Sequence, residues 1–152
     1  MSPTVNSSSL PHASIDTIVQ AFENLSPERV AQLGALYADN ATFKDPFNAV
    51  QGVAAIQGIF AHMYANLHEP RFIITHRIVD GEQCFLTWEF RFAFKRFHTG
   101  VEQCILGGSH LQLDASGRIV MHRDYWDAAE ELYEKIPWVG GLMRWLKRRA
   151  NS

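Results

Sequence analysis

Two aspartates carry the strongest signals for acid/base chemistry, and Asp45 is the first of them along the chain. It precedes Pro46 at the end of a short predicted strand. Proline disfavours the helical region for the residue before it, so we expect Asp45 to be extended and its carboxylate to be held by a rigid turn. A carboxylate surrounded by aromatic rings loses solvation and becomes a better base near neutrality. The alternative interpretation is an ordinary turn aspartate that caps a loop.

Asp124 is the second candidate, because it lies between His122 and Trp126 on the last predicted strand. Alternate residues of a strand share a face, so these three side chains should point the same way. A carboxylate and an imidazole in contact tune each other's protonation and can move a proton between them. The alternative is a structural ion pair, because buried acids are usually paired. The candidate partners are the arginines of the predicted sheet: Arg71, Arg77, Arg91 and Arg123.

Ser109 and His110 lie on the preceding strand and could assist Asp124 in proton transfer or at a substrate oxygen. The pair Gly107-Gly108 comes directly before them and predicts a bulge or a sharp bend. The direction in which His110 faces therefore stays open. A Ser/His/Asp triad can be assembled from these residues, but no nucleophile-elbow motif accompanies it.

Composition argues against several other functions. The seven histidines show neither H-x-H nor H-x-x-x-H spacing, so we expect no metal and no cofactor. The net charge of −2 gives no attraction to nucleic acid. Cys84 and Cys104 form no C-x-x-C motif, and free thiols fit a cytoplasmic protein. The first residues do not resemble a signal peptide, and no apolar run is long enough to span a membrane.

The elements that position the candidates follow from a change of hydrophobic period near residue 71. Helical spacing predicts helices beginning at Ser14, over Pro27–Tyr37 with Ser26 as cap, and over 53–67. Alternation then predicts strands over 71–78, 84–95, 101–113 and 119–126. We expect one domain over residues 14–136, a flexible arm over 1–13, and a basic amphipathic tail over 137–152. The tail could contact a membrane surface or a partner, although packing on its own domain is the simpler reading.

This order of elements predicts an α+β fold. A long antiparallel sheet must curl to bury its aromatic face, and curling around the N-terminal helices makes a cone with a pocket at its open end. Plain core packing is the alternative role for the residues of the pocket wall. The predicted wall residues, which would bind a small apolar molecule, are Phe22, Ile59, Phe60, Met63, His76, Trp88, Phe90 and Trp126.

The segment A-T-F-x-D-P at residues 41–46, followed by G-x-x-A-I at 52–56, resembles the nuclear transport factor 2-like superfamily. This superfamily includes ketosteroid isomerases and SnoaL-like polyketide cyclases, and the resemblance extends over residues 14–126. The isomerases imply Asp45 as the general base. The position of their enolate-binding tyrosine falls on Phe22, and that of their second donor falls near Ser109. Because neither matches, steroid isomerisation is not expected.

The resemblance to the SnoaL-like cyclases implies a different assignment. These enzymes use an aspartate on the last strand with a histidine on the preceding strand. Asp124 fits the first role, and His110 or His122 fits the second. The resemblance also implies a homodimer through the outer face of the sheet, at Thr87, Glu89, Arg91 and Gln103.

Two functions therefore remain open. The first is a cofactor-free isomerase, cyclase or lyase in which Asp45 or Asp124 removes a proton next to a carbonyl group. The second is a non-catalytic module that binds a ligand or dimerises.

Overall fold

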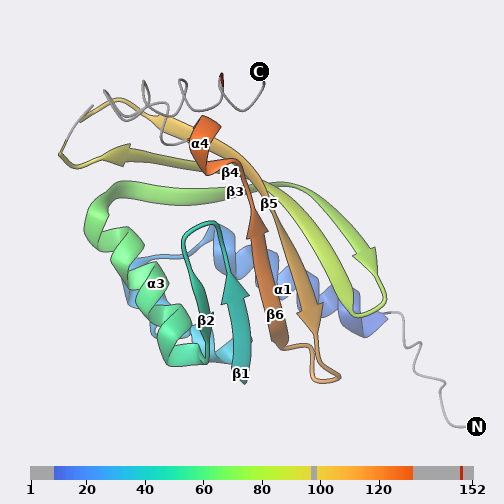
Figure 1. The fold of residues 1–152 in the computed structure, drawn as a ribbon. Helices are drawn as coiled ribbons and strands as arrows, with labels where there is room; N and C mark the ends of the chain where they lie inside the picture. Colours follow the sequence, from blue (N-terminus) through green and yellow to red (C-terminus); the bar gives the residue numbers. More distant parts are fainter. Residues whose placement is uncertain (1–8, 97–98, 132–147, 149–152) are drawn as a thin grey trace, which may run out of the picture.

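A six-stranded sheet forms the frame of the computed structural model, which describes residues 9–96, 99–131 and 148 (Figure 1). The strand order is β2-β1-β6-β5-β4-β3. The strands are β1 (Tyr37–Lys44), β2 (Ala49–Gln51), β3 (Leu67–Asp80), β4 (Gln83–Phe94), β5 (Gln103–Leu113) and β6 (Ile119–Tyr125). The helices are α1 (Ser9–Glu23), α2 (Pro27–Val30), α3 (Val53–Asn66) and α4 (Ala128–Glu131), with a 3₁₀ turn at Leu33–Ala35.

The predicted α+β fold with a curved sheet around N-terminal helices is confirmed, with one change in the sheet. β3 to β6 are antiparallel neighbours, whereas β1 pairs with β6 in parallel. The sheet is therefore mixed. This pairing brings a strand from the N-terminal third of the chain beside the last strand, which no local pattern could reveal.

The core lies between the sheet and the helices α1 and α3. We call the sheet face that packs against them the inner face and the opposite side the outer face. Inward residues of β4 alternate with outward ones, as predicted from the period of two. Buried residues from α1, α3 and the inner face form one cluster, which includes Ile15, Ile18, Phe22, Ile56, Phe60, Leu86 and Leu111.

The prediction of a helix over Pro27–Tyr37 is right only at its start. Ser26 caps α2 by accepting a hydrogen bond from Arg29 N at 3.3 Å, but the α-helix ends at Val30. Tyr37 begins β1 and pairs with Ile119 of β6. Tertiary pairing overrides the helical spacing here, because it buries Tyr37 completely.

Three other boundaries differ from the predictions. α1 begins at Ser9, before the expected cap at Ser14 and inside the expected flexible arm. β3 begins at Leu67 and includes Pro70, which an edge strand tolerates next to a register shift. Of the expected C-terminal tail over 137–152, all but Arg148 lies outside the described residues. No helix in the described part is long and apolar enough to cross a membrane.

The predicted bulge at Gly107-Gly108 is wrong. Both glycines pair in continuous register with β4, opposite Trp88 and Thr87. Their missing side chains instead make room for aromatic rings on the two faces of the sheet. A Cβ on Gly107 would lie 2.4 Å from the Trp88 ring on the inner face, and one on Gly108 would lie 2.6 Å from the Phe85 ring on the outer face.

Candidate active site

Strand register brings the candidate residues together on the inner face. In the antiparallel pairing of β5 with β6, Ser109 stands opposite Asp124. His122 is two residues before Asp124 on β6 and therefore shares its face. The parallel strand β1 lies on the other side of β6, so that Phe43 stands opposite His122.

A chain of hydrogen bonds links five side chains from four strands. The Tyr37 hydroxyl lies 2.7 Å from His122 Nδ1, and His122 Nε2 lies 2.7 Å from Asp124 Oδ1. On the other side, Trp88 Nε1 donates to Ser109 Oγ at 2.9 Å, and Ser109 Oγ donates to the same Asp124 Oδ1 at 2.5 Å. Both arms of the network therefore meet on one carboxylate oxygen.

The Tyr37 arm of the network begins at a phenol that stays protonated because it is buried. Complete burial, and to a lesser extent the negative charge of Asp124, raises the pKa of Tyr37 well above its ordinary value. In the tautomer of His122 that carries its ring proton on Nε2, the hydroxyl donates to Nδ1, and Nε2 donates to Asp124 Oδ1. This arrangement holds Asp124 as a hydrogen-bond acceptor.

Aromatic rings exclude water from most of this network. The rings of Phe22, Tyr37 and Phe43 lie 5.7, 6.0 and 4.7 Å from the His122 ring, measured between centroids. The exposed fraction of the His122 side chain is 4%, against 16% for Asp124. Of this pair, the carboxylate is thus the more exposed group.

Two cavities meet at Asp124. The outer one measures about 270 Å³ and the inner one about 20 Å³, and both are lined by Asp124, Phe60, Phe72 and Trp88. The inner cavity has space for about one water molecule, whereas the outer one approaches the size of pockets that bind small ligands. A substrate would therefore occupy the outer cavity, which we call the outer pocket. It lies on the inner face of the sheet, and Asp124 is part of its lining.

Seven of the eight predicted wall residues do line these cavities. Ile59, Phe60, Met63, Trp88, Phe90 and Trp126 line the outer pocket, and Phe22 lines the inner cavity. His76 is exposed, and its Nδ1 lies 3.3 Å from the Thr87 hydroxyl. A register shift between Ile74 and His76 moves this part of β3 out of simple alternation, so His76 does not face the pocket as predicted.

Asp45 also lines the outer pocket, but its carboxylate is occupied by the turn that follows β1. Oδ1 accepts hydrogen bonds from the backbone N–H of Phe47 at 2.7 Å and of Asn48 at 2.6 Å, and the Asn48 amide lies 3.1 Å from both oxygens. These hydrogen bonds hold the carboxylate against its own turn. The contacts match the turn-capping alternative.

His110 is on the outer face and does not join Asp124. Its Nε2 lies 2.8 Å from Gln83 Oε1, and it lines an outer-face hollow of about 520 Å³ together with Phe85 and Tyr125. Because β5 has no bulge at Gly107-Gly108, Ser109 and His110 point to opposite faces. The Ser109–His110–Asp124 triad is therefore not formed.

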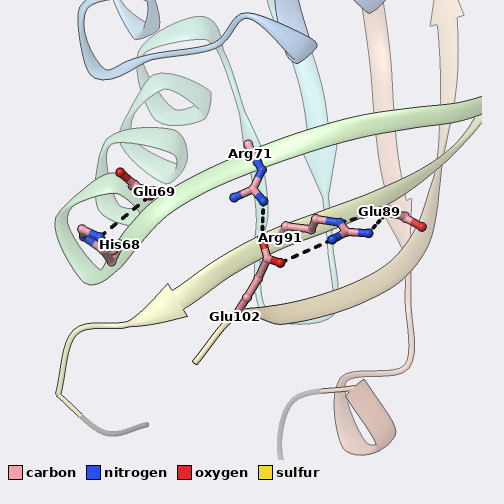
Figure 2. Close-up of polar contacts among 6 residues, drawn as sticks. All are labelled: His68, Glu69, Arg71, Glu89, Arg91 and Glu102. Carbon is pink, nitrogen blue, oxygen red and sulfur yellow. Dashed lines mark hydrogen bonds and ion pairs between the residues drawn. The ribbon is translucent and has the colours of Figure 1, made fainter. Parts of the chain in front are cut away.

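The four arginines that could have neutralised Asp124 have other partners. Figure 2 shows Arg71 and Arg91 from neighbouring strands reaching Glu102, with Arg91 also bound to Glu89. Arg77 pairs with Asp16, and Arg123 lies over the Tyr125 ring at 4.8 Å. Asp124 instead accepts hydrogen bonds from Ser109 and His122.

The sequence interpretation missed Tyr37. Helical spacing predicts that Tyr37 ends a helix, whereas the alternation of Tyr37, Ala41 and Phe43 is the pattern of an inward-facing strand. Two other kinds of chemistry receive no support. Burial raises the pKa of the Cys84 thiol to about 11, with a smaller opposing effect of Arg77, so this thiol is not a nucleophile at neutral pH. No group of three metal-ligating side chains occurs among the described residues.

Comparison with solved structures shows many chains with the same fold. A protein with a ketosteroid isomerase-like fold from Catenulispora acidiphila, in complex with trimethylamine, is 18% identical with a TM-score of 0.66, and the match covers 78% of this chain and 88% of that one. A protein from a Jannaschia species described as a SnoaL-like polyketide cyclase is 11% identical with a TM-score of 0.69, covering 86% and 93%.

An epoxide hydrolase from Mycobacterium tuberculosis is 16% identical with a TM-score of 0.64, covering 95% of this chain and 98% of that one. At these identities, the similarities show the fold alone. No curated protein sequence matches the chain significantly. Residues 18–122 match the family model of the SnoaL-like domain, which is most of the chain. The protein therefore belongs to the SnoaL-like domain family.

Proposed function

We propose that this protein is a cofactor-independent acid/base enzyme in which Asp124 removes a proton from carbon next to a carbonyl group. The substrate would be a small, largely apolar molecule in the outer pocket. The observation that carries the proposal is the position of Asp124, which is fixed by Ser109 and His122 through Oδ1 and borders an aromatic cavity of about 270 Å³. Oδ2 takes part in neither contact and supplies the basic lone pair.

The proposed reaction is an isomerisation, a cyclisation or an elimination. Asp124 accepts a proton from one carbon and returns it to another atom of the product, so no oxidant or second substrate is needed. The low polarity of the pocket strengthens the charge interactions of the base with the reacting centre. Ser109 and His122 hold the base, because their donor hydrogens point at Asp124 and not at a substrate oxygen.

The test uses 5-nitrobenzisoxazole, a small flat molecule whose ring opens when a base removes a proton from carbon. We expect the wild-type protein to open it with saturation kinetics that can be followed by absorbance. Asp124→Asn should lower kcat by at least about 100-fold, because general-base catalysis typically contributes 10² to 10⁴. The matched control is Asp45→Asn, which removes an acid from the rim of the same pocket and should keep most of the rate.

The outcomes separate the two aspartates. A loss of rate in Asp45→Asn but not in Asp124→Asn would make Asp45 the base. Equal rates in both variants and in wild type would reject acid/base catalysis in this pocket. The melting temperature of Asp124→Asn should stay within a few degrees of wild type, which separates lost chemistry from lost folding.

The second candidate function is a non-catalytic module that binds an apolar molecule. The observation that favours it is that the hydrogens of Ser109 and His122 are both given to Asp124. Neither is then available to stabilise charge on a substrate oxygen. Binding of an apolar dye in the outer pocket, without any acceleration of ring opening by the wild-type protein, would support this module over the enzyme.

A further inference from the structure

We propose that Trp88 is a positioning residue for Asp124, acting through Ser109, and that Gly107 is the residue that makes this possible. The proposal deepens the proposed function and rests on Asp124 as the base. Trp88 and Phe90 of β4 both line the outer pocket, and of these two rings only that of Trp88 has a hydrogen-bond donor. That donor does not touch the carboxylate and must act through the serine.

The direction of this arm is fixed by the chemistry of the two groups. An indole N–H can only donate, so the 2.9 Å contact makes Ser109 Oγ an acceptor from Trp88. The single hydrogen of the serine is then directed along its 2.5 Å contact with Asp124 Oδ1. Hydrogen bonds in such a chain polarise one another, so the indole strengthens the bond from serine to carboxylate.

The Trp88 indole reaches Ser109 across the space that Gly107 leaves by having no side chain. Trp88 stands opposite Gly107 in the β4–β5 register, and Ser109 is two residues further along the same face. The ring lies across the Cα of Gly107, where an added Cβ would meet its atoms at 2.4 and 2.8 Å. A side chain at this position would push the six-membered ring away from the strand and pull Nε1 away from Ser109.

The neighbouring residue provides a matched control. Gly108 faces the other side of the sheet, where an added Cβ would meet the Phe85 ring at 2.6 Å. Gly107→Ala and Gly108→Ala therefore introduce the same methyl group into comparably tight ring contacts on adjacent residues of one strand. The methyl group at Gly108 also comes within 3.2 Å of the Leu86 carbonyl oxygen. Only Gly107→Ala displaces the Trp88 indole, whose N–H donates to Ser109. A loss of stability common to both variants reports on packing and not on the network.

The first measurement needs no substrate. The ¹H–¹⁵N signals of the His122 ring report on Asp124 Oδ1, because Nε2–H donates to the oxygen that also accepts from Ser109. We expect the Nε2–H proton signal to move downfield in Trp88→Phe and Gly107→Ala, because Oδ1 binds the imidazole more strongly when the serine bond weakens. The signal should stay at its wild-type position in Gly108→Ala. Trp88→Phe removes the same hydrogen bond but keeps an aromatic ring, so it provides the test if Gly107→Ala does not fold.

The second measurement is the ring opening of 5-nitrobenzisoxazole. We expect kcat to fall about tenfold in Trp88→Phe, corresponding to about 1.4 kcal/mol, while KM changes by less than about twofold because the aromatic wall is kept. An unchanged His122 signal in both Trp88→Phe and Gly107→Ala would overturn the proposal. An inactive wild-type protein whose His122 signal still shifts in these variants would reject the proposed function and keep the positioning role of Trp88.

Discussion

Single residues show how this site holds a negative charge in an aromatic setting. Among the described residues, Asp124 has no arginine partner, and Ser109 and His122 donate to its Oδ1. Each donor is itself fixed by a group behind it, Trp88 behind Ser109 and Tyr37 behind His122. A buried polar network of this kind specifies one arrangement only when every member is satisfied. In the described part of the chain, no buried side-chain nitrogen or oxygen lacks a partner.

At the residue scale, we predict that Tyr37→Phe destabilises the protein and flattens its response to alkaline pH. The variant leaves Nδ1 of the buried His122 without its donor, which should cost about 1–3 kcal/mol at neutral pH. Because burial raises the pKa of Tyr37, the folded protein keeps a proton that the unfolded chain releases. Its contribution to stability is therefore complete below about pH 10 and is lost as the pH rises further.

The measurement is urea denaturation of wild type and Tyr37→Phe at pH 8 and at several values above about pH 10. The free energy of unfolding should fall more steeply with pH in wild type than in the variant. Tyr125→Phe is the control, because that ring is exposed on the outer face and loses the same hydroxyl. If Tyr125→Phe behaved as Tyr37→Phe does, the buried hydrogen bond to His122 would not be the cause.

At the scale of elements, α3 decides the capacity of the outer pocket. It contributes Ile59, Phe60 and Met63 to one side, while β4 contributes Trp88 and Phe90 to the other. Phe60 is buried in the core, whereas Met63 is only partly buried and borders the open volume. A larger side chain at Met63 would therefore fill the pocket without displacing the centre of the core.

We predict that Met63→Trp weakens binding of the apolar dye ANS by at least about tenfold, because the indole occupies most of the space a ligand needs. Fluorescence titration at constant protein concentration measures the change. Ala54→Trp adds the same ring at an exposed position of the same helix, away from the residues that line the pocket. Equal dye affinity in Met63→Trp and wild type would show that the dye, and with it an apolar ligand, binds elsewhere.

At the scale of the whole molecule, the outer face of the sheet is the surface on which a second copy would pack. It carries the ion pairs that Arg71 and Arg91 form with Glu89 and Glu102 (Figure 2), together with exposed apolar side chains, among them Leu106 with an exposed fraction of 59%. Isolated surface ion pairs contribute little to stability. Apolar side chains beside them favour contact with another surface. We propose a homodimer through this face.

Light scattering at micromolar concentration should give twice the mass of one chain. Leu106→Glu should give the monomer, because a charge would be buried opposite Glu89, the residue with which Leu106 pairs across β4 and β5. Ala54→Glu places the same charge on α3 and should leave the dimer intact. A monomeric mass for the wild-type protein would remove this face as an interface between copies.

The sequence by itself determined which residues share a face. His122 and Asp124 point the same way because strand side chains alternate, and Trp88, Phe90 and Phe92 of β4 lie inside for the same reason. These are local properties with a period of two, and they were predicted correctly. Where the backbone leaves that period, as at His76, the prediction was wrong.

Only the tertiary structure decided which of these residues meet. Tyr37 and His122 are 85 positions apart, and Trp88 and Ser109 are 21 apart. Their contacts depend on the parallel pairing of β1 with β6 and on the register of β4 with β5. Neither is encoded by a local repeat, because pairing between distant strands is fixed by the packing of the whole sheet. The same packing placed Asp124 beside the pocket, whereas the contacts that hold Asp45 in its turn are local, two and three residues along the chain.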